Sequence, residues 1–302
     1  MATAPFAPSI ELALPKWEVQ RLVTSWLAAD APAFEVGGFV VGEVERTARL
    51  LGKSPGVFCG RVFAQAAFDA VGGLQVEWFL KDGDVISVED AKAKKPVAIV
   101  RGKAKSILLA ERTALNVISR ASGVATLTRR MLTQVRSKGW QGHLAATRKT
   151  TPGFALVEKY AVLVGGASTH RIDLSQMTML KDNHVWSVGS ITKAVKQAKV
   201  IAGFSSKIEV EARSFEEACE AADAGADVVM LDNMTPAQIK TESARLKAKY
   251  PYIVIEASGG INEDSITEYL CPTVDVVSVG KLTQGYACLD FSLKVDRPQA
   301  KL

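Results

Sequence analysis

The alternation of short apolar segments with helical ones in the second half of the chain limits the possible folds more than any other feature. Apolar runs rich in β-branched residues recur there, and most are separated by segments with helical spacing. The runs cover residues 144–147, 177–182, 207–212, 227–232, 252–257 and 274–279. Such strands alternating with amphipathic helices predict a parallel sheet that is covered on both faces. Six units in a row predict a β/α barrel, TIM-like but with fewer than eight strands.

Capping residues mark the helices between the later runs. Ser214 followed by Glu217 is a capping box, and Gly225 ends the helix that it opens. Thr235 supplies an N-cap, and Pro236 is the first residue of the next helix. A further helical pattern covers 154–164.

The N-terminal part has a different pattern. A helix is predicted over 15–29, and strands over 57–64, 74–79, 85–88 and 97–102. Strands without long helices between them predict a separate antiparallel α+β unit. A long helix is expected to begin near Ser106, and a second one, over 124–137, is expected to follow a break at Ser122-Gly123.

These patterns divide the chain into three parts: an N-terminal domain over 1–112, a barrel over 113–285 and a tail over 286–302. Phe291, Leu293 and Val295 alternate with polar residues in the tail. This alternation predicts one more strand, which returns to the N-terminal domain.

Composition excludes several classes of protein. The chain has 302 residues, and its 37 basic and 32 acidic side chains give a net charge of +5, which suits anionic ligands in general. The basic residues are not bunched among aromatic ones, so we expect no nucleic-acid partner. The four cysteines, Cys59, Cys219, Cys271 and Cys288, form no CxxC pair, which argues against a zinc site and a disulfide framework. We expect no signal peptide, no membrane partner and a cytoplasmic location, with a nuclear presence left open.

Basic side chains and a histidine follow the strand-like runs between residues 143 and 184. They are Arg148, Lys149, His170, Arg171 and Lys181. The ends of parallel strands share one rim of a β/α fold, so these side chains should lie together. Clustered fixed cations repel one another unless an anion lies among them. We favour an anion site, and solvated surface charges are the alternative.

Later strands end in carboxylates or glycines. Glu211 and Asp232 should face the same rim as the cations, although a strand-end carboxylate can also be a helix cap. Ser258-Gly259-Gly260 and Gly280 follow the last two strands, where exposed backbone N–H groups often bind phosphate; ordinary glycine turns are the alternative. The combination indicates a sugar phosphate, a second anionic substrate and a bridging Mg²⁺ ion.

Several motifs together identify a family. They are Glu111-Arg112-Thr113-Ala114-Leu115-Asn116, Ser122-Gly123-Val124-Ala125-Thr126, Thr147-Arg148-Lys149-Thr150-Thr151-Pro152-Gly153, Gly165-Gly166 to His170-Arg171, Lys181-Asp182-Asn183-His184, Leu231-Asp232-Asn233 and Ser258-Gly259-Gly260-Ile261. Over most of its length the chain resembles the quinolinate phosphoribosyltransferases, carboxylating enzymes of de novo NAD biosynthesis. The resemblance implies a pentosyltransferase with an N-terminal α/β open sandwich and an incomplete β/α barrel. It would join quinolinate to phosphoribosyl pyrophosphate with Mg²⁺, giving nicotinate mononucleotide, pyrophosphate and CO₂.

The resemblance also implies a role for each motif residue. The quinolinate carboxylates would be bound by Arg112 from a neighbouring subunit together with Thr147, Arg148, His170, Arg171 and Lys181. The phosphoribosyl part and its phosphates would be bound by Lys149, Glu211, Asp232, Ser258, Gly259, Gly260 and Gly280. The catalytic residues would be Lys149, Lys181, Glu211 and Asp232, and Mg²⁺ would be held mainly through the substrate, with Glu211 and Asp232 as candidate ligands.

One segment departs from many bacterial members of the family. Lys281-Leu282-Thr283-Gln284-Gly285 stands where they have Ala-Leu-Thr-His-Ser. This segment and the one from Gly165 to Arg171 are closer to eukaryotic-type members, which form hexamers built from dimers with shared active sites. Two other functions stay open: a paralogue that uses nicotinate or another aromatic acid, and a non-catalytic nucleotide sensor.

Overall fold

The computed structural model describes residues 9–297, which form two compact units. Residues 1–8, and 298–302 of the predicted tail, lie outside the described part. The first unit extends to Leu127 and also takes in Leu163–Gly165 and the segment from Tyr286 onward, while the second contains the rest. The boundary that we expected at residue 112 falls inside a long helix, and the contacts divide the chain between Leu127 and Thr128.

A four-stranded antiparallel sheet forms the centre of the first unit. Its strand order is β12-β1-β5-β3, with β1 at Glu45–Gly52, β3 at Gln75–Trp78, β5 at Pro96–Lys103 and β12 at Phe291–Val295. Leu50 of β1 lies opposite Leu293 of β12 on one side and Ala98 of β5 on the other, and all three are buried. The strands predicted over 74–79 and 97–102 are confirmed, whereas β1 was not predicted.

The strand predicted over 57–64 is wrong for most of its length. Only β2 (Gly56–Val57) is extended, and helix α3 (Arg61–Val71) follows. Phe63, Ala64, Ala67 and Phe68 are buried along one face of α3, which is a helical spacing. The helix is possible so soon after β2 because Gly60, at φ +102°, turns the chain in a conformation that other residues rarely adopt.

The remaining elements of the first unit are short, apart from one helix. They are a 3₁₀ turn at Ile10–Ala13, α1 at Lys16–Asp30, α2 at Val36–Val41, β4 at Val85–Ile86 and α4 at Val88–Lys92. Helix α1 confirms the helix predicted over 15–29. Strand β4 pairs with β2 in a separate antiparallel ladder.

One continuous helix, α5 (Ala104–Ser137), replaces the two that we predicted. Ser122-Gly123 is no break, because both residues serve packing. The Ser122 hydroxyl accepts a hydrogen bond from the backbone N–H of Cys59 and donates one to its carbonyl. A Cβ at Gly123 would lie 2.4 Å from the carbonyl oxygen of Ala287, so only glycine allows this close approach.

Six parallel strands form the sheet of the second unit, in the order β6-β11-β10-β9-β8-β7. They are β6 at His143–Ala146, β7 at Thr178–Leu180, β8 at Ile208–Ala212, β9 at Val228–Asp232, β10 at Val254–Ser258 and β11 at Val276–Val279. All six predicted strands are confirmed, and the sheet has fewer strands than a full eight-stranded barrel. Because the strands are parallel, their carboxyl ends lie along one edge of the sheet.

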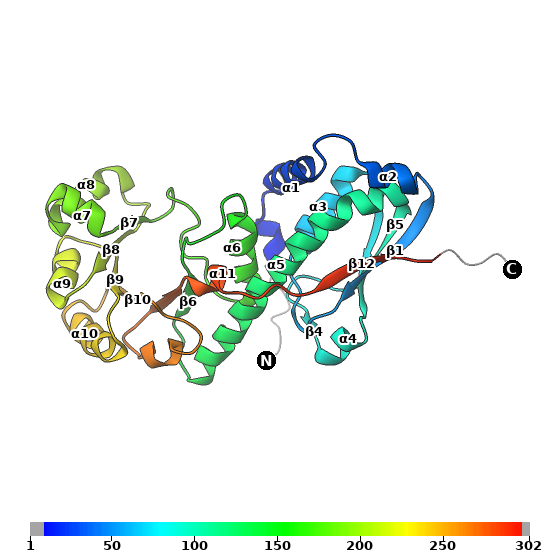
Figure 1. The fold of residues 1–302 in the computed structure, drawn as a ribbon. Helices are drawn as coiled ribbons and strands as arrows, with labels where there is room; N and C mark the ends of the chain where they lie inside the picture. Colours follow the sequence, from blue (N-terminus) through cyan, green and yellow to red (C-terminus); the bar gives the residue numbers. More distant parts are fainter. Residues whose placement is uncertain (1–8, 298–302) are drawn as a thin grey trace. The chain divides into compact units, whose positions relative to one another are not determined.

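Helices connect these strands and lie outside the sheet (Figure 1). They are α6 at Ala155–Gly165, α7 at Asp182–Val188, α8 at Ile191–Ala202, α9 at Phe215–Asp223, α10 at Pro236–Lys249 and α11 at Lys281–Gln284, with a 3₁₀ turn at Ile266–Tyr269. The predicted caps are confirmed: Ser214 accepts from the N–H of Glu217, and Thr235 and Gln238 form a capping box. Within the described part of the chain, no helix is both long and apolar enough to cross a membrane.

The side chains of the parallel sheet form the main apolar core of the second unit. The free energy of unfolding should therefore fall when buried methyl groups of this sheet are removed. Leu231 of β9 is fully buried, whereas Leu174 is 71 % exposed. We expect Leu231→Ala to lower the free energy of unfolding by about 2–5 kcal/mol because it leaves a cavity, and Leu174→Ala to change it little. Urea denaturation of both variants measures this. Equal losses in the two would contradict the assigned core.

Candidate active site

A cavity of about 530 Å³ opens at the carboxyl ends of the parallel strands of the second unit. It collects residues from the ends of all six strands and from the loops that follow them. Every site residue predicted within the barrel lines it: Thr147, Arg148, Lys149, His170, Arg171, Lys181, Glu211, Asp232, Ser258, Gly259, Gly260 and Gly280. The strand ends thus bring the cations, carboxylates and glycine loops into one site.

Arg112, the remaining predicted residue, lies on α5 in the first unit and does not line this cavity. Its side chain is exposed. Within residues 9–297 it forms no ion pair with a carboxylate. A local salt bridge, for example to the neighbouring Glu111, would have been a purely structural role for Arg112, and no such bridge is found among the described residues.

Arg171 is the most confined cation of the site. It is only 7 % exposed, and one guanidinium nitrogen, Nη2, lies 3.3 Å from the sulfur of Met179. Its buried Nε has no hydrogen-bond partner among the described residues. Burial and the nearby charge of Arg148 lower the pKa of Arg171 from its ordinary high value. A buried cation with an unused donor is unfavourable by itself and is relieved when an anion binds.

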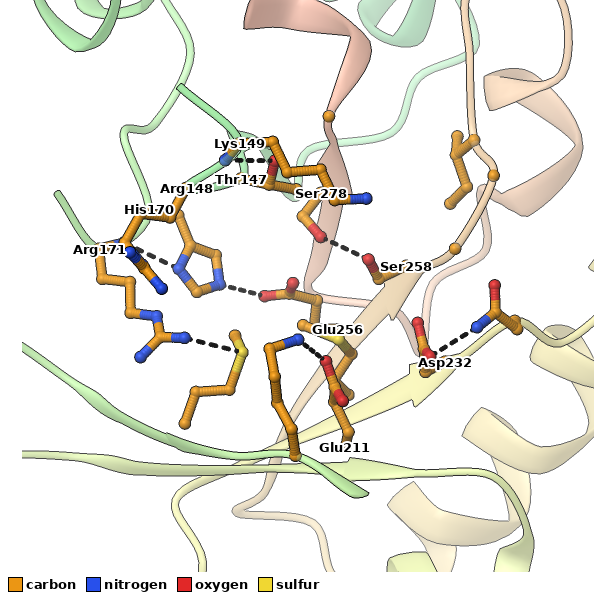
Figure 2. A pocket seen from close by; sticks show the side chains of 18 of the residues that line it. Thr147, Arg148, Lys149, His170, Arg171, Glu211, Asp232, Glu256, Ser258 and Ser278 are labelled. Atoms are coloured by element: carbon orange, nitrogen blue, oxygen red, sulfur yellow. Dashed lines mark hydrogen bonds and ion pairs between the residues drawn. The ribbon is translucent and has the colours of Figure 1, made fainter. Parts of the chain in front are cut away.

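His170 joins Arg171 to two buried carboxylates, Glu209 and Glu256, and Figure 2 shows its hydrogen bond to Glu256. Its Nε2 lies 3.0 Å from an oxygen of Glu256 and 3.5 Å from one of Glu209. Its Nδ1 accepts a 2.8 Å hydrogen bond from the backbone N–H of Arg171. His170 has a positive φ of 54°, which directs its ring back along its own chain. Both ring nitrogens thus have protein partners, and the imidazole orients the backbone that carries Arg171.

These three buried groups share an extra proton. Burial opposes a charged imidazole, but Glu209 and Glu256 outweigh it and raise the pKa of His170 to about 9. Burial and the charge of Glu256 raise the pKa of Glu209 to about 7. The Arg171 N–H points at Nδ1, where a second hydrogen would clash with it. The three groups titrate together, so the proton belongs to the cluster as a whole.

The same cluster has the residue types of a transition-metal site, and its three candidate ligand atoms lie within 4.8 Å of one another. A metal at Nε2 would require the hydrogen to move to Nδ1 of His170. The N–H of Arg171 already occupies that nitrogen. The hydrogen-bond pattern therefore favours a protonated Nε2 and no metal.

The predicted carboxylates Glu211 and Asp232 are only partly screened by protein partners. Lys181 forms an ion pair with Glu211, and the side-chain amide of Asn233 donates to Asp232 at 2.7 Å. Figure 2 shows Asp232 and Ser258 across the cavity from His170 and Arg171. One side of the site therefore carries buried cationic groups, and the other side carries carboxylates and small polar groups.

The glycine loops fit a close approach of a ligand to the backbone. Gly259 has φ +101°, and a Cβ there would lie 2.5 Å from the backbone nitrogen of Asn233. A Cβ at Gly280 would lie 3.1 Å from the side chain of Lys149. A larger residue at Gly259 would therefore collide with the backbone of Asn233, and one at Gly280 would press on Lys149, so the glycines allow these loops to pack closely at the rim of the cavity.

Sequence reasoning missed several residues of the site. Arg213 and Asp182 pair at its rim, and Glu209 and Glu256 lie inside strands, where we looked only at strand ends. The alternation of Glu209 with Glu211 in β8 was the available signal, since both point away from the side that faces the helices. Glu256 lies two residues before Ser258 in β10, so these two side chains share one face of the sheet in the same way.

Comparison with known proteins agrees with this geometry. Two family models match, described as the quinolinate phosphoribosyl transferase N-terminal domain over residues 33–122 and the C-terminal domain over 124–294. The carboxylating nicotinate-nucleotide pyrophosphorylase of Dictyostelium discoideum is 48 % identical over 294 residues, covering 94 % of this chain and 98 % of that one. The human protein of the same name is 46 % identical, covering 96 % and 95 %. The solved structure of the Francisella tularensis nicotinate-nucleotide pyrophosphorylase superimposes with a TM-score of 0.85 at 32 % identity, covering 96 % of this chain and all of that one.

The buried guanidinium predicts how the site responds to an anion. We expect Arg171→Gln to bind phthalate, an aromatic with two adjacent carboxylates, about 10- to 100-fold more weakly, as befits loss of a hydrogen bond between charged groups. Without a ligand, the free energy of unfolding of the variant should equal or exceed that of the wild type, because the variant lacks a buried charge that Arg148 repels. Calorimetric titration and thermal unfolding measure both. Arg130→Gln, which removes an exposed ion pair with Glu263, is the control and should bind normally. Unchanged affinity in Arg171→Gln would place the anion elsewhere.

Proposed function

The chain belongs to the quinolinate phosphoribosyltransferase family over both of its domains, and we propose that it is a carboxylating nicotinate-nucleotide pyrophosphorylase. It transfers the phosphoribosyl group of phosphoribosyl pyrophosphate to the ring nitrogen of quinolinate. The products are nicotinate mononucleotide, pyrophosphate and CO₂, which places the enzyme in de novo NAD biosynthesis.

The observation that carries this proposal is the confined guanidinium of Arg171, whose buried Nε has no hydrogen-bond partner among the described residues and which is close enough to Arg148 for the two charges to repel. A single carboxylate would neutralise one of these two fixed charges. A ligand with two adjacent carboxylates matches both, and quinolinate has them at positions 2 and 3 of its ring. Arg148 and Arg171 bind these carboxylates, and Lys181 and Thr147 complete the pocket.

On the other side of the cavity, the sugar phosphate meets carboxylates and glycines. Glu211 and Asp232 accept hydrogen bonds from the ribose hydroxyls, and their charges stabilise the positive ribose that forms as pyrophosphate leaves. Lys149 faces the departing pyrophosphate. The 5′-phosphate is bound by backbone N–H groups of Gly259, Gly260 and Gly280 and by the hydroxyl of Ser258.

Mg²⁺ fits the oxygen donors on this side of the site. Asp232 and Glu211 offer carboxylate oxygens, and Mg²⁺ is commonly held by one or two carboxylates together with substrate phosphates. When bound, the ion would neutralise negative charge on the leaving pyrophosphate. Asp232 would be the more available of the two as a ligand, because Glu211 is already paired with Lys181.

Loss of CO₂ follows from the positive charge that the ring nitrogen acquires. Once ribose is attached, the positive ring nitrogen stabilises the electron pair left on C2 as CO₂ departs, and a proton then takes the place of CO₂ on C2. The protein has mainly to position the 2-carboxylate and exclude water while the bond breaks. Lys181 and Arg171 hold that ring in place during both steps.

We further propose that the enzyme is a cytoplasmic homo-oligomer, a dimer with shared active sites that assembles into a hexamer. Large apolar side chains lie exposed at α2, where Phe39 is 86 % and Val40 78 % exposed, and at the end of α8, where Ile201 is 90 % exposed. Each of these two places, one in each unit, is a candidate association surface. Arg112, which is exposed and forms no ion pair within residues 9–297, is the residue that a neighbouring subunit receives.

The reaction itself is tested by supplying quinolinate, phosphoribosyl pyrophosphate and Mg²⁺. We expect nicotinate mononucleotide, pyrophosphate and CO₂ in equal amounts, with Asp232→Asn as a shape-matched variant of much lower turnover because it lacks the carboxylate charge. Product formation from nicotinate without CO₂ would identify the enzyme as a paralogue for another acid. Binding of both substrates without turnover would identify a sensor.

Shared active sites predict complementation between two inactive variants. The Arg112→Ala and Lys181→Ala variants are mixed and allowed to exchange subunits. Half of the resulting dimers then contain one subunit of each variant, and each of these dimers has one intact pocket. Activity should recover to about a quarter of the wild-type value if assembly is symmetric. A mixture of Lys181→Ala with Arg171→Ala is the control, because both residues belong to the same pocket, and it should stay inactive. No recovery with exchange confirmed by mass would show that Arg112 does not act in a partner's site.

A further inference from the structure

A lysine is fully buried beside the site, and nothing in the proposed reaction uses it. Lys159 lies on α6 and is 1 % exposed. Its ammonium donates to three backbone carbonyls: that of Ala146 at 3.0 Å, that of Thr147 at 2.9 Å, and that of Thr169. All three hydrogens of the ammonium therefore have acceptors. A lysine is rarely buried so completely unless its charge is fully paired or hydrogen-bonded.

The three carbonyls belong to two separate segments that carry the cations of the cavity. Ala146 ends β6, and Thr147 leads directly into Arg148. Thr169 precedes the turn of His170, whose positive φ sets the course of the chain into Arg171. The ammonium of Lys159 is thus hydrogen-bonded to the backbones of both segments. Its acceptors lie immediately before Arg148 and two residues before Arg171.

The neighbour of Lys159 on α6 holds the first of these segments a second time. Glu158 is fully buried and accepts hydrogen bonds from the backbone N–H of Thr151, at 2.9 Å, and from its hydroxyl, at 2.8 Å. The loop that carries Arg148 is therefore tied to α6 at both of its ends.

We propose that Lys159 is a positioning residue, whose ammonium sets the spacing between Arg148 and Arg171 by tying the end of β6 to the turn at Thr169. Two adjacent carboxylates on a ring have a fixed separation, so the two guanidinium groups must keep a matching one. Lys159 touches neither substrate nor reacting atoms. Only the identity of the dicarboxylate as quinolinate rests on the proposed function.

The surroundings of Lys159 disfavour its positive charge. Burial, together with the charges of Arg148 and Arg171, lowers its pKa to about 8, and Glu158 on the same helix opposes part of this shift. A neutral amine has two hydrogens and cannot donate to three carbonyls. Rising pH should therefore loosen the two segments once Lys159 loses its proton.

Stability and activity should respond to that proton in opposite directions. The unfolded chain keeps Lys159 protonated up to its ordinary value of 10.5, so between about 8 and 10.5 it binds more protons than the folded chain. The contribution of Lys159 to the free energy of unfolding then rises with pH, while kcat/KM falls as the spacing is lost. A lysine that served stability alone would not lower activity in this range.

The test compares Lys159→Met with Lys196→Met, the same change at an exposed position of α8. We expect Lys159→Met to bind quinolinate at least about 10-fold more weakly by calorimetry and to lose about 100-fold in kcat/KM, as for misplaced binding groups in general. Hydrogen exchange should quicken at residues 146–151 and 167–171, and the fall in kcat/KM above pH 8 that we expect of the wild type should vanish. Lys196→Met should match the wild type throughout.

Other outcomes decide against the proposal. Wild-type binding and turnover in Lys159→Met, or faster exchange spread evenly over the whole unit, would overturn it. If Lys159→Met does not fold, Lys159→Gln keeps two N–H donors and should show a smaller loss of the same kind, and wild-type behaviour in that variant would equally overturn it. A wild type that binds quinolinate but does not turn it over would refute the proposed function and leave the calorimetry and exchange results to judge Lys159.

Discussion

Repulsion among fixed cations is the constraint around which the second unit is arranged. Arg148 and Lys149 follow the end of β6, and Arg171 lies in the loop between α6 and β7. All three line one cavity, and like charges so gathered raise the free energy of the unliganded protein. The fold offsets part of this with Glu209 and Glu256, buried below Arg171 and joined to its backbone through His170. Lys181 is offset separately by Glu211. The remaining imbalance at Arg171 is relieved by an anionic ligand, so binding and catalysis draw on free energy already stored in the empty site.

Backbone hydrogen bonds make this arrangement rigid enough to discriminate between ligands. Parallel strands fix where each segment begins, but the loops beyond them have no ladder partners to hold them. Buried side chains of α6 replace those partners by bonding directly to loop carbonyls and N–H groups. The same interactions that keep the cations close are thus the ones that keep them at a defined separation.

The sequence predicted the parts of this site that follow from strand position, and it failed where packing decides. Strand ends in a parallel sheet meet at one edge, so Arg148, Glu211 and Asp232 could be placed together from the pattern alone. Lys159 could not, because a Glu-Lys pair within a helical run has the same pattern when it faces solvent. Ser122-Gly123 suggested a helix break, whereas its real role depends on Cys59 and Ala287, which are distant in sequence. The left-handed turn at His170 was likewise invisible, since a histidine does not favour that conformation as glycine does.

The central claim is that the site is built for two adjacent carboxylates, and the choice between quinolinate and nicotinate tests it most directly. The acids differ by one carboxylate, which would leave a buried charge–charge hydrogen bond unmade in the nicotinate complex. Competition between them for the wild-type enzyme, with phosphoribosyl pyrophosphate and Mg²⁺ present, gives the ratio of their kcat/KM values. The account predicts that quinolinate is favoured by at least about 100-fold, as expected for the loss of one or two charge-assisted contacts. Equal use of the two acids would contradict it.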